Sequence, residues 1–403
     1  MEIFDELNLD KSLLQTLKGL KIVKPTLIQA QAIPHILAGE DVIGESATGS
    51  GKTLAFGCGI IDKVVSKKGL QALVLAPTRE LAEQVKDSLI KFSSYKHFNI
   101  VPIYGGVSLE PQIHNLRYAD VVVATPGRLL DHLERRTVNL SHVKLLILDE
   151  ADRMLDMGFI VDVEKIIKLC PKDRQTLFFS ATISTEIKKL ANHYMKSPVS
   201  VSAVKLVDPS KLEQVFYDVN KKAKLSLLLH LLKNENSGLV MVFCNTRRIT
   251  DLVVKNLEIN KVNVIAIHGG LSQNKRMKTI KQFNRSTVCV LVCTDIAARG
   301  LHIDNVSHVY NYDIPKDAKD YIHRIGRTAR AGEKGKVINL LCEFDYENLS
   351  RIQTEYRAIT IKKLELPEIK KVMMIRDDYN RARGNNSFAR KNSFSRKRRP
   401  DWV

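Results

Sequence analysis

Cysteine, glycine, proline and long apolar runs are all scarce in this sequence of 403 residues. The six cysteines are scattered, none forms a CxxC pair and several lie in apolar runs, which predicts reduced core cysteines and no disulfide or zinc framework. With only 20 glycines and 12 prolines, a fibrous or wholly disordered chain is excluded. No apolar run approaches the roughly 18 to 20 residues of a membrane helix, and residues 1–6 lack the basic start of a secretory signal. We therefore expect no membrane partner and a cytoplasmic protein, or a nuclear one if the source is eukaryotic.

Acidic residues are the minority among the charged ones. The chain has 63 Lys and Arg against 44 Asp and Glu, a net charge of +19. Residues 370–403 hold 11 Lys and Arg against 3 Asp, so this short segment carries a net +8. The expected partner is a polyanion, and nucleic acid is favoured over a membrane because no strongly amphipathic anchor accompanies the charge.

Short runs rich in Val, Ile and Leu recur with helical stretches between them. Their apolarity is continuous, which indicates strands that are covered on both faces. The fold class is therefore α/β, with mostly parallel sheets between helix layers. The runs are Leu70–Ala76, Asp120–Ala124, Lys144–Leu148, Thr176–Phe179, Gly238–Phe243, Val262–Ile267, Thr287–Val292 and Lys336–Leu341.

The spacing of these runs divides the chain. Between the fourth and fifth runs, Ser197–Lys211 contains two prolines and four serines and reads as a linker. We predict two α/β domains, residues 1–205 and 212–366, joined by residues 206–211. The apolar periodicity stops at Pro367, so residues 367–403 are expected to form a basic disordered tail.

A phosphate-binding loop is the first chemical motif. Strand-like Asp41–Gly44 leads into Ser-Ala-Thr-Gly-Ser-Gly-Lys-Thr and an apolar helix. Small residues let backbone N–H groups surround phosphate oxygens at a helix N-terminus, Lys52 can reach the β and γ phosphates, and the Thr53 hydroxyl can ligate Mg²⁺. A bland Gly-rich turn is the alternative. The predicted nucleotide site comprises Ser46, Ala47, Thr48, Gly49, Ser50, Gly51, Lys52 and Thr53.

An acidic cluster follows the buried run that ends at Leu148. A carboxylate at the carboxyl end of a parallel strand lies where such sheets bind ligands, so Asp149 can hold Mg²⁺ through water. Glu150 is placed to orient and deprotonate an attacking water. An acidic turn that only caps the next helix is the alternative.

With these two motifs the chain resembles the DEAD-box ATP-dependent RNA helicases over about residues 4–345. The resemblance implies two tandem RecA-like domains, ATP and Mg²⁺ as cofactors, and RNA-stimulated ATP hydrolysis coupled to local, non-processive remodelling of structured RNA and RNA–protein complexes. It also implies a monomer, with ribosomal or RNA-decay proteins as further partners. The other motifs that carry it are Pro77–Ala82, Gly105–Gly106, Thr125–Arg128, Ser180–Thr182, Gln273 with Arg276, Thr294–Gly300 and His323–Arg330.

The family pattern assigns further residues to the nucleotide. Gln29 matches the glutamine that selects adenine, and Phe4 and Ile22 match positions that contact the base. The family usually has a glycine followed by an aromatic residue where this chain has Lys21 and Ile22. In the second domain, Arg327 would meet the γ-phosphate and Arg330 would act as the arginine finger.

The resemblance also assigns RNA contacts and a coupling path. Hydroxyls, guanidinium groups and backbone N–H groups at glycine suit phosphate and 2′-OH contacts, which predicts sequence-independent binding. The coupling residues would be Asp152, Ser180, Thr182 and His323. The RNA-binding residues would be Pro77, Thr78, Arg79, Gly105, Gly106, Thr125, Arg128, Arg247, Arg276 and Thr294.

Three further positions depart from the family pattern. His302 and Gly270 stand where acidic residues are usual, and Ala329 replaces a glycine in the last motif. Two rival functions stay open from the sequence: a DNA-translocating motor of the same superfamily, and an RNA-annealing chaperone or nucleotide-gated clamp with little unwinding.

Overall fold

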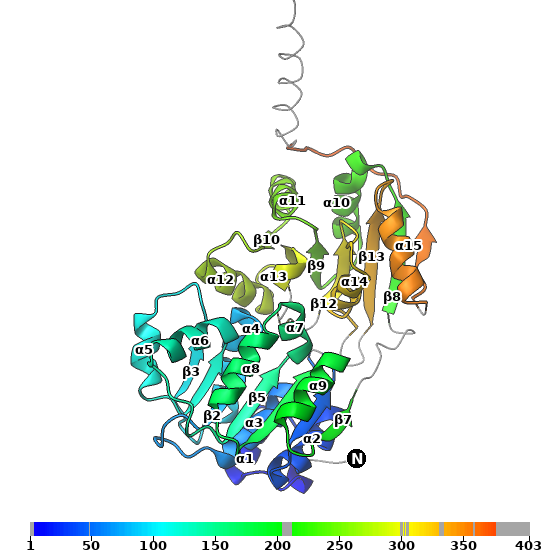
Figure 1. Ribbon diagram of the computed structural model, residues 1–403. Helices are drawn as coiled ribbons and strands as arrows, with labels where there is room; N and C mark the ends of the chain where they lie inside the picture. The colour runs from blue at the N-terminus through cyan, green and yellow to red at the C-terminus, as the bar shows by residue number, and fades with distance from the viewer. Residues whose placement is uncertain are drawn as a thin grey trace, which may run out of the picture.

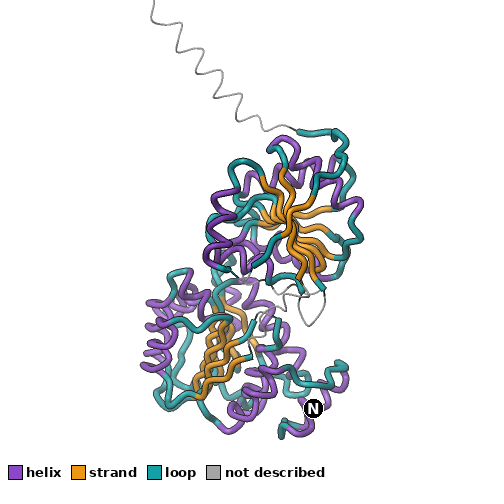
Figure 2. Tube along the Cα trace, turned by 90° about the vertical axis from the view of Figure 1, so that its right-hand side faces the viewer, coloured by secondary structure: helices purple, strands orange, loops and turns teal. Residues whose placement is uncertain are grey.

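The chain folds into two seven-stranded sheets, each flanked by helices on both faces (Figures 1 and 2). The computed structural model describes residues 4–47, 49–203, 212–298, 301, 303, 306–329, 334–357 and 359–375. We call the part before residue 204 domain 1 and the part from residue 212 domain 2. In the described part of the chain, no helix combines the length and the apolar character that crossing a bilayer requires.

Domain 1 has the strand order β3-β4-β2-β5-β6-β1-β7, and all of its paired strands are parallel. Its strands are β1 (Val42–Glu45), β2 (Ala72–Leu75), β3 (Ile100–Ile103), β4 (Val121–Ala124), β5 (Leu145–Asp149), β6 (Gln175–Ser180) and β7 (Val199–Ser202). Its helices are the 3₁₀ helix η1 (Phe4–Glu6) and α1 (Lys11–Gly19), α2 (Leu27–Ala38), α3 (Lys52–Lys63), α4 (Arg79–Phe92), α5 (Glu110–Leu116), α6 (Pro126–Glu134), α7 (Ala151–Asp156), α8 (Ile160–Leu169) and α9 (Thr185–Tyr194).

Domain 2 repeats the plan with the order β10-β11-β9-β12-β13-β8-β14, again with parallel pairs. Its strands are β8 (Leu212–Asp218), β9 (Leu239–Phe243), β10 (Val264–Ile267), β11 (Val290–Cys293), β12 (Val306–Asn311), β13 (Gly335–Leu341) and β14 (Lys362–Leu364). Its helices are the 3₁₀ helix η3 (Lys221–Ala223) and α10 (Lys224–Asn234), α11 (Arg247–Ile259), α12 (Gln273–Asn284), α13 (Asp295–Ala298), α14 (Ala318–Ile325) and α15 (Tyr346–Glu355).

Seven of the eight apolar runs are interior strands of these sheets, and the eighth, Val262–Ile267, is the edge strand β10. In β2, Ala72 and Val74 face one hydrophobic cluster while Leu73 and Leu75 face the other, and none of the four is exposed. A strand that buries both faces has to be apolar at every position, which is why the pattern is continuous. In parallel strands the carboxyl ends meet at one edge, so the loops after β1, β2, β4, β5 and β6 are brought together there.

Three expectations about local structure need correction. Part of the predicted linker, Val199–Ser202, is strand β7, which pairs with β1 at the edge of the sheet. Residues 367–375, expected to be disordered, lie on domain 2: Ile369 and Val372 pack against its core, and Ile375 N donates to Asn256 Oδ1 at 2.7 Å. All six cysteines are free, as predicted, but Cys289 is exposed and does not lie in a core.

Candidate nucleotide site and interdomain cleft

The phosphate-binding loop joins β1 to α3. Gly49 and Gly51 have φ angles of +83° and +92°, a conformation that side chains with a Cβ rarely adopt. A Cβ on Gly51 would also lie 2.3 Å from Gln29 Nε2. Lys52, the first residue of α3, is 3% exposed, and its Nζ donates to Ser46 O at 3.0 Å. The lysine ammonium is thus held over the loop whose backbone would surround phosphate; Thr48 lies outside the described residues.

The segment that was predicted to select adenine is tied to this loop. Gln29 Nε2 donates to Gly51 O at 3.0 Å, and Gln29 Oε1 accepts from Thr26 N at 2.9 Å. Thr26 Oγ1 donates to Ser50 O at 2.7 Å. Thr26 and Gln29 therefore hold the backbone of the phosphate loop at Ser50 and Gly51. Ile22 is half-buried, and Phe4 is 3% exposed within the core of domain 1, which leaves little of its ring open to a base.

Asp149 ends β5 on the same sheet edge. It is 1% exposed, its Oδ1 has no hydrogen-bond partner among the described residues, and burial raises its pKa to about 7 although the nearby Lys52 lowers it. A buried carboxylate oxygen without a partner suits a cation, and Thr53 lies in the first turn of α3. In the described part of the chain no group of three His, Cys, Asp or Glu could hold a metal alone, so Mg²⁺ would take its other ligands from phosphate and water.

Glu150 adopts a left-handed backbone conformation, φ 53° and ψ 53°, at the start of α7. This conformation costs of order 1 kcal/mol in a non-glycine residue and is found mainly where function requires it. Glu150 is buried, with only 3% of its surface exposed. The turn therefore holds a second carboxylate beside Asp149 at the carboxyl edge of the sheet.

The predicted coupling residues Asp152, Ser180 and Thr182 contact one another. Asp152 Oδ2 accepts from Thr182 N at 3.1 Å and from Thr182 Oγ1 at 3.2 Å. Ser180 Oγ accepts from Asp152 N at 3.1 Å and donates to Thr182 O at 2.8 Å. The loop after β6 is thus bonded to the first turn of α7, directly after Glu150.

The arginines of the last motif differ in their surroundings. Arg327 is 4% exposed, and its guanidinium donates to Leu301 O. Arg324, to which the sequence assigned no role, is 1% exposed and pairs with Asp295 through Nε and Nη2, at 2.6 and 2.7 Å. His323 is half-buried on α14, and Arg330 lies outside the described residues.

A cleft of about 430 Å³ lies between the two domains. Most residues predicted to bind RNA line this cleft. Gly106 follows the lining residue Gly105. Arg247, at the N-terminus of α11, lies beside the lining residue Gly269, because a Cβ built on Gly269 would be 2.9 Å from the Arg247 guanidinium. Thr294 precedes α13 and is 7% exposed. The lining residues are Pro77, Thr78, Arg79, Glu80, Gly105, Thr125, Gly127, Arg128, Met157, Phe159, Gly269, Leu271, Gln273, Arg276 and Ile296.

The loop that contains Gly105 and Gly106 is held in place by contacts from several neighbouring residues. Gly106 has φ +79°, and a Cβ there would clash with the Arg79 guanidinium. Both Nη atoms of Arg128 donate to Val107 O at 3.3 Å. Gln112 Nε2 donates to Tyr104 O at 3.1 Å. The backbone of this loop is therefore positioned before any ligand arrives.

Glu80 links the two domains, a role that the sequence did not reveal. It is 3% exposed at the start of α4, and its Oε1 accepts from Gln273 Nε2 at 3.0 Å and lies 2.7 Å from Arg276 Nε, both on α12. Arg276, predicted as an RNA contact, is thus engaged in an interdomain ion pair. A second pair joins Lys319 and Asp156 at 2.8 Å.

Comparison with known proteins identifies the family. A family model described as "DEAD/DEAH box helicase" matches residues 26–190, and one described as "Helicase conserved C-terminal domain" matches residues 223–332. The DEAD-box ATP-dependent RNA helicase CshA of Geobacillus kaustophilus is 43% identical over 357 residues, which are 88% of this chain and 76% of that protein. The chain belongs to the DEAD-box RNA helicase family.

Other DEAD-box proteins extend the comparison. CshA of Bacillus cereus is 45% identical over 339 residues, 83% of this chain, and this chain spans 64% of the length of that relative. A DEAD box protein of Methanococcus jannaschii is 41% identical, with a TM-score of 0.56 over 90% of this chain and 99% of that one. Dbp5 of Saccharomyces cerevisiae bound to RNA and ADP BeF3 is 29% identical, with a TM-score of 0.81 and a match that covers 96% of this chain and 99% of that one. The two domains are therefore tandem RecA-like domains, as the sequence predicted.

Two departures from the DEAD-box pattern fall at left-handed backbone positions. Lys21, where the pattern has glycine, has φ 57°, and Ala329, which also replaces a glycine, has φ 55°. Glycine adopts this conformation without a Cβ penalty, so the residues present here carry strain that the usual residue avoids.

Proposed function

We propose that this protein hydrolyses ATP in an RNA-stimulated reaction and uses the cycle to separate short RNA duplexes locally or to remodel RNA–protein complexes. The observation that carries the proposal is the placement of α7. This helix begins directly after Glu150 and ends before Met157, which lines the interdomain cleft. Six residues of helix span about 9 Å, so the candidate catalytic carboxylate and the candidate RNA surface are one short helix apart.

In the nucleotide site each residue has a distinct task. The backbone of the phosphate loop and Lys52 would bind the phosphates, and Gln29 would bond adenine while it holds Gly51. Glu150 would orient the attacking water and accept its proton. Mg²⁺, when bound by Asp149 and Thr53, would neutralise charge on the β and γ phosphates.

The second domain would supply positive charge to the transition state. Hydrolysis requires that charge on the γ-phosphoryl oxygens be stabilised, which a single arginine can accelerate by a factor of about 10³ to 10⁵. Arg327 and Arg330 are proposed for this task, and His323 for contact with the end of β5. Because these residues belong to domain 2, hydrolysis depends on the domains being together.

RNA would bind across the cleft through phosphate and 2′-OH contacts, largely without regard to sequence. Support comes from the relatives: Dbp5 bound to RNA and ADP BeF3, and Mss116p bound to ssRNA and AMP-PNP, superpose with TM-scores of 0.81 and 0.79. The Asp152, Ser180 and Thr182 contacts would couple the two sites. Cytoplasmic location, a monomeric state and protein partners from the ribosome or RNA decay remain predictions from the sequence.

The test is an ATPase assay with and without RNA, on the parent and on Glu150→Gln. The variant keeps the side-chain volume but loses the base, so hydrolysis should fall by at least about 10² while ATP binding stays near normal. Glu134→Gln, at the end of α6 and outside both sites, is the matched control. Near-normal turnover in Glu150→Gln would remove this residue from the mechanism. If RNA does not stimulate the ATPase of the parent, a non-enzymatic RNA-annealing protein is favoured. If the parent unwinds DNA-only duplexes, a DNA motor is favoured.

A further inference from the structure

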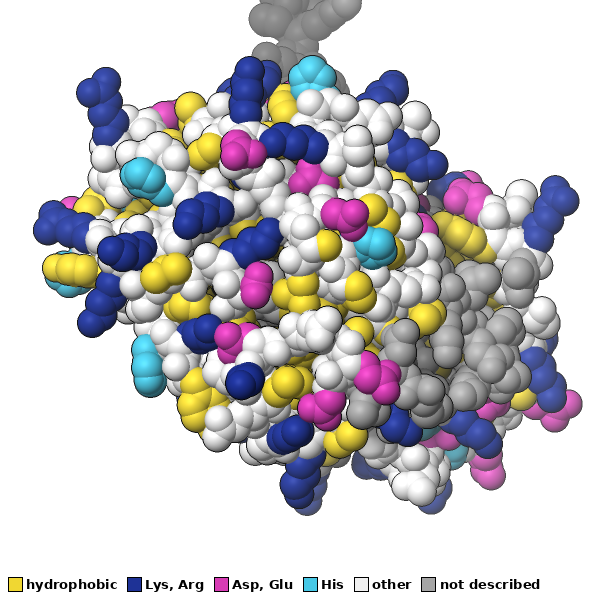
Figure 3. Space-filling model, turned by 90° about the horizontal axis from the view of Figure 1, so that it is seen from below, with side chains coloured by type: hydrophobic (Ala, Val, Ile, Leu, Met, Phe, Trp, Pro, Cys, Tyr) yellow, Lys and Arg dark blue, Asp and Glu magenta, His cyan; other side chains and the backbone are white. Residues whose placement is uncertain are grey.

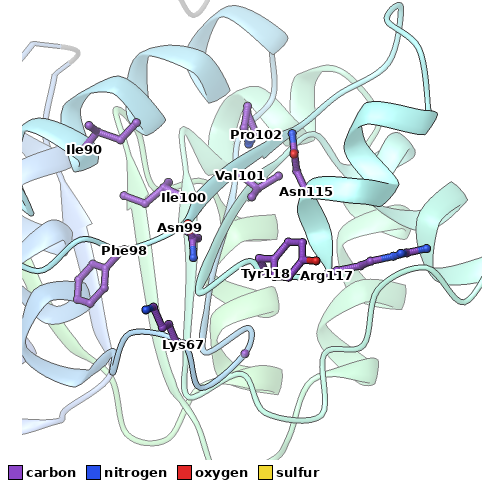
Figure 4. Close-up of a pocket in the computed structure, with 11 residues that line it drawn as sticks. Lys67, Ile90, Phe98, Asn99, Ile100, Val101, Pro102, Asn115, Arg117 and Tyr118 are labelled. Atoms are coloured by element: carbon purple, nitrogen blue, oxygen red, sulfur yellow. The ribbon is translucent and has the colours of Figure 1, made fainter.

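A groove of about 680 Å³ lies along the open edge of the domain 1 sheet, beside β3 (Figure 4). We call it the β3 groove. It is separate from the phosphate loop and shares no lining residue with the interdomain cleft. Figure 4 shows Phe98 and Tyr118 on opposite sides of Asn99, with Lys67 below it.

The side chains of the groove combine aromatic rings with cations. Tyr118 is 63% exposed, Phe98 is half-buried, and Lys67 and Arg117 are both exposed. Among the described residues that line the groove, none is acidic. On the face of domain 1 that points away from domain 2, Lys and Arg side chains are spread among Asp and Glu side chains (Figure 3). Aromatic faces beside cations, without carboxylates, are the composition that binds single-stranded nucleic acid.

The edge strand itself is poorly suited to a peptide. Asn99 O and Ile103 O accept hydrogen bonds from backbone N–H groups at the two ends of β4. The alternate residues Ile100 and Pro102 therefore direct their backbone groups to the open edge. Pro102 has no N–H, and an added peptide strand would lack a donor in the middle of the ladder. Nucleic acid does not need this ladder.

The β3 groove leads to the interdomain cleft. Its lining extends to Pro102, and Gly105, three residues later, lines the cleft. The extended chain from Asn99 to Gly105 covers about 20 Å. A strand in the cleft could therefore continue along β3 and stay on the protein surface.

We propose that the β3 groove binds unpaired RNA that continues from the interdomain cleft, with a base stacked on Tyr118 and phosphates on Lys67 and Arg117. The inference rests on the proposed function and extends its RNA surface beyond the two-domain cleft. It predicts that affinity grows with the length of the strand and that the added affinity depends on these three side chains.

The test measures binding of two labelled oligouridylates to the full chain with a non-hydrolysable ATP analogue. One strand only spans the cleft, and the other is about twice as long. Because stacking contributes to each bound base, Tyr118→Ala should raise the Kd of the longer strand at least about 5-fold and leave that of the shorter strand unchanged. Tyr95→Ala is the matched control, because Tyr95 is 52% exposed in the same domain and does not line the groove.

The charged residues are tested through salt dependence. Lys67→Gln and Arg117→Gln should each lower the slope of log Kobs against log salt for the longer strand by about 0.7, as expected for one lost phosphate contact. Tyr118→Ala should leave that slope unchanged. Lys68→Gln, at an exposed neighbour that does not line the groove, is the control.

The inference is overturned if the parent binds both strands with equal Kd values, or if the groove variants bind the longer strand like the parent. If such variants also lose binding to another protein, the groove is a protein-docking site. If neither strand binds the parent, the proposed function itself fails. If the shorter strand binds and stimulates the ATPase but the groove variants bind the longer strand like the parent, only the RNA-binding role of the β3 groove is refuted.

Discussion

Replacing Glu80 by Gln should weaken the closed arrangement of the two domains. Glu80 is almost fully buried, and its Oε1 contacts both Gln273 and Arg276 across the domain boundary. Glutamine keeps the shape and a carbonyl acceptor but removes the negative charge that faces Arg276. Removing one charge of a buried ion pair costs about 3 to 5 kcal/mol, which corresponds to a factor of at least about 10² in an equilibrium constant. The closed-to-open ratio should fall by about that factor.

The consequence is measurable because the proposed hydrolysis depends on both domains. Fluorescence energy transfer between one dye on each domain, in the presence of RNA and a non-hydrolysable ATP analogue, should report a loss of the closed state. RNA-stimulated ATPase should fall in parallel, while ATP binding to domain 1 alone should change little. Thermal unfolding of the variant checks that domain 1 remains folded.

The ion pair between Asp156 and Lys319 supplies the control. Its side chains are 26% and 44% exposed, and exposed pairs contribute about 0 to 1 kcal/mol. Asp156→Asn should therefore change closure by less than about 5-fold. Combining Glu80→Gln with Arg276→Gln should cost less than the sum of the single changes. Equal closure in Glu80→Gln and Asp156→Asn, or additive effects of the double change, would refute the role given to the buried pair.

Three further changes have clear expected results. Arg330→Ala should abolish RNA-stimulated ATPase and leave RNA binding without nucleotide little changed; lost RNA affinity with a retained ATPase rate would contradict the division between the nucleotide and RNA surfaces. Ala329→Gly should raise the free energy of unfolding of domain 2 by up to about 1 kcal/mol in urea denaturation, because the left-handed backbone is no longer strained; a destabilised variant would show that this strain is absent. Deleting residues 376–403, which spares the segment that packs on domain 2, should weaken RNA binding and flatten its salt dependence while the RNA-saturated ATPase rate is kept. Phe388→Ala with Phe394→Ala, in the repeated units Asn386–Lys391 and Asn392–Lys397, should weaken binding at an unchanged salt slope. A double variant that binds like the parent would leave the tail as an electrostatic tether only.

Local sequence predicted most of the interior strands, because a strand that buries both faces is usually apolar at every position. All eight predicted runs are strands, and strand-like Asp41–Gly44 overlaps β1. The phosphate loop was equally readable, since its glycines are required by positive φ angles and its Lys-Thr pair by phosphate chemistry. Hydrogen bonds also join Asp152, Ser180 and Thr182, three residues that the family resemblance assigns to the coupling path.

Strand β12 was missed although it lies in the middle of its sheet. Its sequence, Val-Ser-His-Val-Tyr-Asn, is polar at several positions. Asn311 is fully buried, yet it accepts from Arg324 Nη1 at 2.9 Å and donates to Asn339 Oδ1 at 2.8 Å. Those partners come from α14 and β13, so the polar residue becomes acceptable only after the fold has assembled.

What the tertiary structure alone decided is how distant polar groups pair. Glu80 lies in a motif that the sequence identified, but nothing near it in the chain indicates that its partners are Gln273 and Arg276, about two hundred residues away. The edge strand β3 is only four residues long and contains a proline, two features that hide it in the sequence, and the groove beside it collects residues from several separate segments. A sequence records the chemistry that each residue brings and the local constraint that each strand or loop imposes. The contacts between domains and the shape of a surface depend on which segments fold against each other, and that is determined only when the whole chain packs.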